Sequence, residues 1–115
     1  MRVNIKPLSI NEAFQGRRFK TKAYKKYERD MLKILPKLTV PEGELSLKLE
    51  FGLSARSADI DNPIKCFVDC LQKAYGFDDK MIYKLQVEKV IVKRGKEYID
   101  FTIKGLAKTN EKVVV

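Results

Sequence analysis

The sequence predicts an α/β domain of the α+β type, a mixed β-sheet of about four strands with two helices packed on it. Apolar residues recur at helical spacing in segments 22–35 and 62–75. They alternate with polar residues in segments 44–51 and 98–104, as in half-buried strands. The predicted element order is β-α-β-α-β-β, in a single domain that spans residues 1–115.

The first third of the chain is predicted to form a short strand, a loop and the first helix. Residues 2–6 have strand character, and residues 7–16 are expected to form a loop. Thr21 is the predicted N-cap of the helix, which ends before Pro36. Its apolar stripe consists of Tyr24, Tyr27, Met31, Ile34 and Leu35, and its opposite face carries Lys22, Lys25, Lys26, Arg29 and Lys33.

The second helix is predicted to follow a strand in which every second residue is apolar. It begins near Asn62, has Pro63 in its first turn and ends at Gly76. Its inward face is expected to carry Ile64, Phe67, Val68, Leu71 and Tyr75.

Two further strands complete the predicted sheet. Residues 81–93 are expected to form a long strand with a bulge near Glu88 and Lys89, because the apolar phase changes there. Residues 94–96 are then expected to form a hairpin turn into the last strand, in which Ile99, Phe101 and Ile103 face inward.

The charge of the chain predicts a polyanionic partner, most simply a nucleic acid. The net charge is +9, and residues 1–41 alone hold 11 Lys or Arg and 3 Asp or Glu. The alternative is a charged surface that only aids solubility. No apolar run has the form of a signal peptide or reaches membrane-spanning length, so the expectation is a cytoplasmic protein that does not enter membranes.

The two cysteines are expected to be free thiols. Cys66 and Cys70 lie four residues apart on the predicted second helix, a poor geometry for a disulfide. The chain has no histidine and no further cysteine to complete a zinc site, and His-based acid–base catalysis is excluded.

Five aspartates form an acidic island in this basic chain: Asp59, Asp61, Asp69, Asp78 and Asp79. Asp59 and Asp61 are two apart in the segment that enters the second helix, and in extended backbone such residues point the same way. Clustered carboxylates repel one another and nucleic acid, a cost that a bound divalent cation relieves. Each residue also has a structural interpretation, as a helix cap at Asp61, an ion pair between Asp61 and Lys65, or turn chemistry at Asp78 and Asp79.

The run Asp-Ile-Asp-Asn-Pro-Ile-Lys-Cys-Phe-Val-Asp-Cys-Leu at residues 59–71, followed by Gly-Phe-Asp-Asp at 76–79, resembles a known family motif. It is similar to the pattern D-x-D-N-x-x-K-x-x-x-D-x-L…G…D-D of the RusA-type Holliday junction resolvases. Residues 7–11, 17–29 and 97–103 resemble the family's early turn, basic first helix region and closing strand, so the resemblance covers nearly the whole chain. Such proteins are common in phages and prophages of bacteria, and this chain looks like a compact member.

The resemblance implies a homodimeric endonuclease, dependent on Mg²⁺ or Mn²⁺, that nicks two opposed strands of a four-way DNA junction. It places the metal-binding carboxylates on Asp59, Asp61 and Asp79, which are also catalytic, and the essential lysine on Lys65. Whether Asp78 or Asp79 is the third ligand stays open, since only Phe77 separates Gly76 from the pair. The expected DNA-binding residues are Asn11, Arg17, Arg18, Lys20, Lys22, Arg56 and Lys65, with Lys25 and Lys26 as further phosphate contacts.

Two other functions stay open from the sequence. The same fold could cut branched DNA with less selectivity, or the chain could be a non-catalytic basic nucleic-acid-binding protein. Ala58 stands where the family often has a basic residue, which bears on junction affinity. Dimerisation is expected because two opposed strands lie across a two-fold axis. Exposed apolar residues are expected to form the interface, from the set Tyr24, Tyr27, Tyr75, Phe77 and 113–115.

Overall fold

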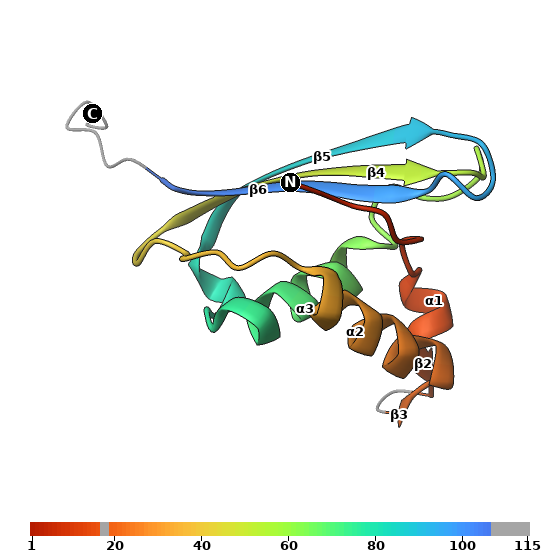
Figure 1. Cartoon of the computed structure of the whole chain (residues 1–115), viewed down its shortest axis with the longest axis horizontal. Helices are drawn as coiled ribbons and strands as arrows, with labels where there is room; N and C mark the ends of the chain where they lie inside the picture. The colour runs from red at the N-terminus through yellow and green to blue at the C-terminus, as the bar shows by residue number, and fades with distance from the viewer. Residues whose placement is uncertain (17–18, 107–115) are drawn as a thin grey trace.

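The computed structural model describes residues 1–16 and 19–106 and confirms the predicted α+β architecture (Figure 1). Its main sheet has four strands in the order β1-β6-β4-β5, and the helices lie against one face of it. Strands β4 and β5 are parallel, whereas β6 is antiparallel to both β4 and β1, so the sheet is mixed. The strands are β1 (Arg2–Val3), β4 (Leu45–Leu53), β5 (Ile82–Ile91) and β6 (Tyr98–Gly105).

The central strand β4 follows the alternation that the sequence predicts. Leu45, Leu47, Leu49 and Phe51 point toward the helices and are at most 1% exposed. Ile99 and Phe101 of β6 are buried beside them, while Ile103 is only partly buried. A strand with partners on both edges and helices over one face buries every second side chain, which is why this part of the prediction is confirmed.

The predicted hairpin between the last two strands is wrong. A turn does lie at the predicted place, where Gly95 has a φ of 91° and the Lys96 N–H bonds to the Lys93 carbonyl at 2.9 Å. However, β5 and β6 flank β4 on opposite sides, so this turn carries the chain across the end of β4. The Val92 N–H donates to the Leu53 carbonyl at 2.8 Å and ties the crossing to that end.

The predicted bulge in β5 is also misplaced. Glu88 and Lys89 pair in register with Glu50 and Phe51 of β4. The irregularity lies at the start of β5, where the register passes from Ile82 to Lys84 and leaves Tyr83 as the extra residue. The apolar phase changes without a bulge because β5 is an edge strand whose two faces are both partly exposed.

The first long helix, α2 (Lys22–Ile34), begins at its predicted cap and packs three predicted residues into the core. The Thr21 hydroxyl accepts from the Tyr24 N–H at 3.2 Å. Tyr24, Tyr27 and Met31 are buried, and Leu35, the C-cap, is partly buried against the core, but Ile34, the last residue of the helix, is exposed.

The second long helix, α3 (Ile64–Tyr75), joins the parallel strands β4 and β5 as the helix of a β-α-β unit. It begins two residues later than predicted, with Pro63 as N-cap, and ends as predicted at Gly76, whose φ is 73°. Four of its buried residues, Cys66, Phe67, Cys70 and Leu71, fill the space between α2 and the sheet. Among the described residues, no helix is long and apolar enough to cross a membrane.

The segment predicted as a loop contains regular structure, and the first strand is shorter than the predicted 2–6. A short helix α1 (Ile10–Ala13) follows Ser9, whose hydroxyl caps it by accepting from the Asn11 N–H at 3.1 Å. Strands β2 (Phe14–Gln15) and β3 (Phe19–Lys20) form a separate two-stranded ladder. A one-turn 3₁₀ helix η1 (Asp79–Met81) precedes β5.

One position of the sheet has room only for glycine. A Cβ on Gly52 would collide with the ring of Tyr98. That ring cannot move away freely, because its hydroxyl donates to Glu50 at 2.6 Å and the Arg2 guanidinium stacks 3.8 Å from its centre. We expect Gly52→Ala to lower the free energy of unfolding by about 1–3 kcal/mol, as overpacking does. Gly105→Ala, whose Cβ has ordinary contacts with Pro41, is the control and should be nearly neutral in the same urea titration.

Candidate active site and nucleic-acid interface

Asp59 and Asp61 lie together in the loop that leads from the C-terminal end of β4 into α3. In an open sheet this end of a parallel strand is where ligands bind. Both residues are exposed, and neither takes part in an ion pair among the described residues. The loop curls around them, since the Asn62 N–H bonds to the Asp59 carbonyl at 3.3 Å and the Ile64 N–H to the Asp61 carbonyl at 3.2 Å.

Two contacts that the sequence did not predict hold this loop. The Lys89 ammonium, on β5, donates to the carbonyls of Arg56 and Ala58 at 3.1 and 2.8 Å. The Ile10 N–H of α1 donates to the Asn62 carbonyl at 2.9 Å. Both join residues that are more than 30 positions apart, so no local pattern signals them.

The two structural interpretations of Asp61 do not describe its surroundings. The N-cap of α3 is Pro63, and no side chain makes a capping hydrogen bond there. Lys65 forms its ion pair with Asp69, at 3.0 Å, one turn further along the helix. The carboxylate of Asp61 is therefore left available for another positive partner.

Asp69 is the centre of a hydrogen-bonded group that connects α2 with α3. One carboxylate oxygen accepts from Lys65 at 3.0 Å and from the Gln72 amide at 3.3 Å, and the other accepts from the Tyr24 hydroxyl at 3.0 Å. Burial first, and then the Asp69 carboxylate, raises the pKa of Tyr24 above its ordinary value, so the hydroxyl remains a donor. Lys65 therefore has a fixed anionic partner, while its side chain is 55% exposed and can reach a ligand.

Asp79 lies at the opposite end of α3 from Asp59 and Asp61. The helix has 12 residues and is therefore about 18 Å long. Within residues 1–16 and 19–106, no group of three or more Asp, Glu, His or Cys residues is placed to hold a metal ion. The folded chain thus does not bring the three expected ligands to one point.

Asp78 and Asp79 have different surroundings. The Asp78 side chain caps η1 by accepting from the Lys80 N–H at 3.0 Å. The backbone N–H of Asp79 donates to the Gln72 amide oxygen at 2.8 Å, which leaves the exposed Asp79 carboxylate unused by that contact. Of the two, Asp79 is the better placed to bind a cation.

The chemistry of the donor set fits a hard divalent cation in part. Asp59 and Asp61 offer carboxylate oxygens, the ligands that Mg²⁺ and Mn²⁺ prefer, and the chain has no histidine to favour a softer metal. One chain alone supplies two of the three carboxylates at that place.

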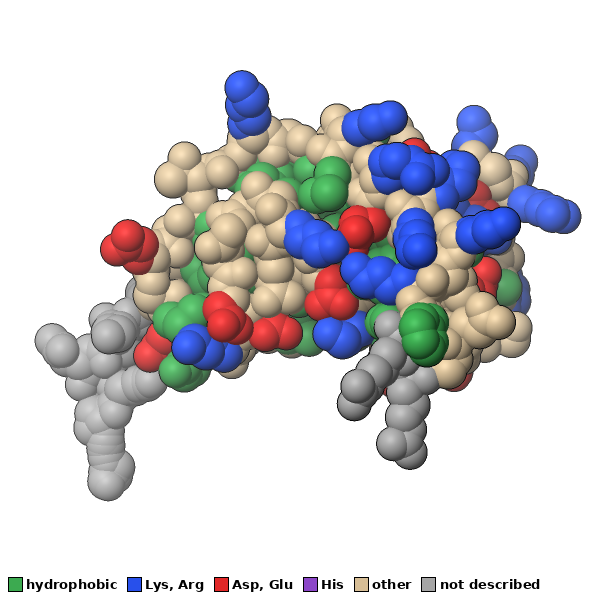
Figure 2. All heavy atoms as spheres, turned by 90° about the horizontal axis from the view of Figure 1, so that it is seen from below, with side chains coloured by type: hydrophobic (Ala, Val, Ile, Leu, Met, Phe, Trp, Pro, Cys, Tyr) green, Lys and Arg blue, Asp and Glu red, His purple; other side chains and the backbone are tan. Residues whose placement is uncertain are grey.

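Lysine and arginine side chains gather on the helical side of the molecule, around α2 (Figure 2). Lys22, Lys25, Lys26, Arg29 and Lys33 are exposed, as predicted for the outer face of this helix. Lys26 pairs with Asp30 at 2.7 Å, while Lys22 and Lys25 have no ion pair among the described residues. Asn11 on α1 and Arg56 beside Asp59 are also exposed, and Arg17 and Arg18 lie outside the described residues.

Lys20 has a structural role that its basic surroundings did not predict. Its ammonium pairs with Glu28 at 3.1 Å and lies 4.9 Å from the centre of the Tyr24 ring. Lys73 of α3 pairs with the same carboxylate at 2.8 Å. Burial alone would raise the pKa of Glu28, but hydrogen bonds from Lys73 and Lys20 lower it below its usual range. Glu28 thus joins β3, α2 and α3.

The cysteines have the structural role that the sequence predicts. Cys66 and Cys70 are free thiols and fully buried. Burial raises the pKa of Cys66 to about 11 and that of Cys70 to about 12, so neither is a thiolate near neutral pH. They contribute packing and take no part in the site.

A family model for endodeoxyribonuclease RusA matches residues 8–102, which include the whole segment from Asp59 to Asp79. A comparison with curated proteins finds no match. The match covers far more than half of the 115 residues, and the fold and the acidic motif agree with it. The chain therefore belongs to the RusA family of Holliday-junction-resolving endodeoxyribonucleases.

Proposed function

We propose that this protein resolves four-way DNA junctions by paired nicks in opposed strands, and that it depends on Mg²⁺, for which Mn²⁺ can substitute. The observation that carries the proposal is the pair Asp59 and Asp61, exposed and without an ion-pair partner among the described residues at the entry to α3. A basic protein that binds nucleic acid would lose affinity by exposing these charges, unless a cation binds them. A non-catalytic binding protein would gain nothing from them.

Asp59, Asp61 and Asp79 are the proposed metal ligands, and Lys65 the proposed cationic catalyst. The cation would supply charge compensation at the phosphodiester and make water a better nucleophile toward phosphorus. Lys65 would add positive charge beside the phosphate oxygens in the transition state. Asp69 is a positioning residue, because it holds the Lys65 ammonium while the lysine stem stays exposed.

We infer that the third ligand comes from a second copy of the chain. In a symmetric dimer whose two α3 helices run antiparallel, the N-terminal end of one helix lies beside the C-terminal end of the other. Asp59 and Asp61 of each chain would then meet Asp79 of its partner, and each dimer would have two equivalent sites. This arrangement reconciles the separation of the three aspartates within one chain with the need for three oxygen ligands.

Strand β5 is the proposed contact between the copies. It is an edge strand, so the backbone hydrogen-bonding groups on its outer side have no partner in the main sheet. If β5 pairs antiparallel with β5 of a second copy, the two α3 helices also run antiparallel. Tyr83 is 63% exposed and Leu85 45%, and Ile60 in the loop before α3 is exposed as well. The interface set expected from the sequence needs correction, since Tyr24 and Tyr27 are buried, Tyr75 and Phe77 partly buried, and 113–115 lie outside the described residues.

The proposed DNA-binding surface consists of the outer face of α2 and the loops beside the aspartates. Its proposed members are Asn11, Arg17, Arg18, Lys20, Lys22, Arg56 and Lys65, with Lys25 and Lys26 on the same helix. Lys20 would contribute least, because it already pairs with Glu28. We place the protein in the bacterial cytoplasm, encoded by a phage or prophage, on the ground of its family alone.

The experiment that tests this function compares a mobile synthetic four-way junction with its linear duplex counterpart. With Mg²⁺ the protein should nick opposed strands of the junction and leave the duplex intact, and with a chelator it should bind the junction without cutting. Equal cutting in chelator would disprove the metal dependence. Equal cutting of the duplex would favour the less selective nuclease of the same fold.

Neutralising two lysines of α2 should weaken binding through lost phosphate contacts. Lys22→Gln with Lys25→Gln is expected to reduce the slope of log affinity against log salt by about one unit per lost contact. The measurement is a series of junction titrations in chelator at several salt concentrations. Lys48→Gln, which removes the same charge from the sheet face opposite the helices, is the control and should leave the slope unchanged. An unchanged slope in the double variant would assign these lysines to solubility.

Removing the charge of Asp69 should slow cutting without weakening DNA binding. Asp69→Asn leaves an oxygen that can accept from Tyr24 but no anionic partner for Lys65, and we expect a loss of about 10- to 100-fold in single-turnover cutting. Tyr24→Phe keeps the Lys65–Asp69 pair and is expected to lower stability more than cutting. If both variants lose cutting only in proportion to their unfolded fraction, Asp69 has a structural role alone.

A further inference from the structure

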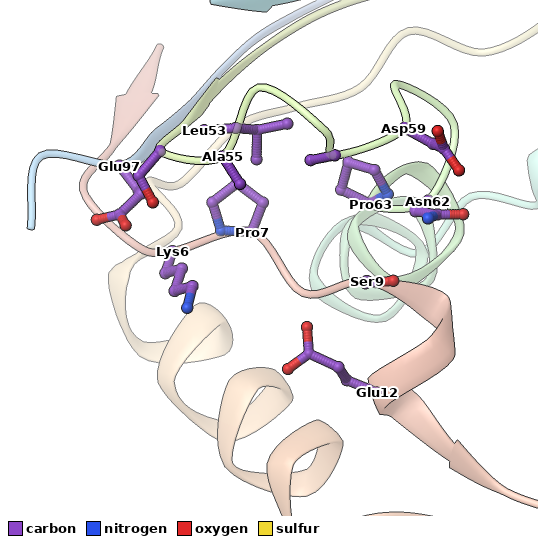
Figure 3. Close-up of a pocket in the computed structure, with 12 residues that line it drawn as sticks. Lys6, Pro7, Ser9, Glu12, Leu53, Ala55, Asp59, Asn62, Pro63 and Glu97 are labelled. Carbon is purple, nitrogen blue, oxygen red and sulfur yellow. The ribbon is translucent and has the colours of Figure 1, made fainter. Parts of the chain in front are cut away.

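A hollow of about 250 Å³ opens beside Asp59 (Figure 3). It lies between the segment that leads into α1 and the loop that leads from β4 to α3. Figure 3 shows Asp59 and Asn62 on one side of it, Lys6 and Glu97 on the other, and Glu12 below. Its volume is smaller than the roughly 300–1,000 Å³ of sites for drug-sized ligands, so it suits a single small ring system.

The walls of the hollow offer flat apolar surface together with hydrogen-bonding groups. The apolar part comes from two proline rings and from short side chains: Pro7, Pro63, Leu53, Ala55 and Ala58. Polar groups come from Ser9, Ser54 and Asn62. Apolar surface beside a few directional polar groups is how proteins hold an unstacked nucleobase.

The charges inside the hollow disfavour phosphate there and favour a neutral ligand that donates hydrogen bonds. Besides Asp59, whose carboxylate is a proposed metal ligand, Glu12 and Glu97 place two carboxylates against the single ammonium of Lys6. Glu97 has a carboxylate that stays charged and accepts hydrogen bonds. A hydrogen bond from its own backbone N–H is the main cause that lowers its pKa, and the carboxylate also accepts from the Gly95 N–H at 2.9 Å. Carboxylates accept readily from the exocyclic amino group of a base.

The hollow is held open by contacts between its two walls. The bond from the Ile10 N–H to the Asn62 carbonyl joins them, and the Ser9 hydroxyl is fixed by its bond to the Asn11 N–H. Lys89 holds the loop that carries Ala55, Ala58 and Asp59. A ligand would therefore enter a site that already has its shape.

We propose that this hollow binds one unstacked nucleobase of the junction, from a nucleotide adjacent to the phosphodiester that is cut. The proposal rests on the proposed function, since Asp59 lines the hollow and marks the position of the phosphate. Where the arms of a junction are not stacked on one another, a base at the branch point has a stacking neighbour on one side only, so turning it out of the helix costs less there than in a duplex. The carboxylates favour adenine, cytosine or guanine over thymine, which has no exocyclic amino group.

The test uses junctions that carry 2-aminopurine, whose fluorescence rises on unstacking, at each nucleotide that flanks the cut. The protein is added in chelator, so that binding is measured by anisotropy in the same samples and no strand is cut. We expect a severalfold rise at one position with the wild-type protein. Ala55→Leu and Ser54→Leu, which each fill the hollow, should abolish the rise and change junction affinity by less than about threefold. Ser57→Leu, in the same loop but outside the hollow, is the matched control and should keep it.

If the wild-type protein binds and cuts junctions without a rise in 2-aminopurine fluorescence at any position, this inference alone is overturned. A fluorescence rise that persists in both Ala55→Leu and Ser54→Leu, when these variants are folded, also overturns it. A wild-type protein that neither binds nor cuts junctions overturns the proposed function as well. Cutting rates of junctions with each of the four bases at the unstacked position test the base preference. The junction with thymine there should be cut at least about fivefold more slowly than the other three, and equal rates would overturn the assigned role of the carboxylates.

Discussion

Asp61→Asn is expected to reduce junction cutting in Mg²⁺ by more than about 100-fold, beyond the 10- to 100-fold loss typical of residues that only support a metal ligand. The substitution removes one ligand charge and keeps the size of the side chain. Junction affinity in chelator should hold or rise, because a negative charge near the phosphates is gone. The measurements are single-turnover cutting rates and equilibrium binding of the same junction.

The melting temperature of Asp61→Asn distinguishes a metal-binding role of Asp61 from a structural role as a helix cap or ion-pair partner. The Asp61 side chain neither caps α3 nor pairs with Lys65, so Asp61→Asn should melt at the same temperature as the parent protein. Asp30→Asn, which removes an exposed carboxylate paired with Lys26 on α2, is the control and should cut normally. A variant at position 61 that melts much earlier and still cuts when folded would restore the capping role.

Mixing two inactive variants is expected to restore cutting. Asp61→Asn and Asp79→Asn should each be inactive as homodimers, because every site then lacks a ligand. In a mixed dimer with shared sites, one site loses two ligands and the other has its full set. After subunit exchange, the mixture should therefore nick one strand of the junction at up to about half the wild-type rate per mixed dimer, given one intact site of two.

The control for this experiment is a mixture of Asp59→Asn with Asp61→Asn. Both substitutions fall at the same end of α3, so every site in the mixed dimer lacks a ligand and the mixture should stay inactive. Failure of the first mixture to recover activity, although the two chains exchange, would show that the sites are not shared between chains. A monomer at micromolar concentration that cuts both strands in concert would disprove dimerisation altogether.

The sequence predicted those parts of the fold whose pattern is local and which bury one face against their neighbours. The alternation in β4 and the helical spacing in α3 were readable because both elements are covered by neighbours. The hairpin prediction failed because a short turn between two strands indicates local pairing, whereas here β4 takes the place between β5 and β6. The short elements α1, β2 and β3 are stabilised by tertiary contacts, such as the Thr21 N–H to the Ala13 carbonyl at 2.9 Å, and have no periodic signal.

The candidate site was predictable in its composition and less so in its geometry. The spacing of Asp59, Asp61 and Lys65 places them at one end of a helix, and the structure has them there. The distance between Asp79 and the pair Asp59 and Asp61 follows from the length of α3 and from the position of β5, which begins at the C-terminal end of that helix. A sequence motif encodes neither of them. Lys89 and Tyr24 reach the site from distant positions, so no spacing in the sequence could have assigned them.

Direct metal binding tests most simply whether Asp59 and Asp61 hold a divalent cation. Mn²⁺ titrated into the wild-type protein and followed by electron paramagnetic resonance should show sites that saturate, one or more for each chain. The double variant Asp59→Asn with Asp61→Asn, folded as judged by its melting curve, should lose them. Mn²⁺ binding of equal affinity and number in the wild-type protein and the folded double variant would contradict the account.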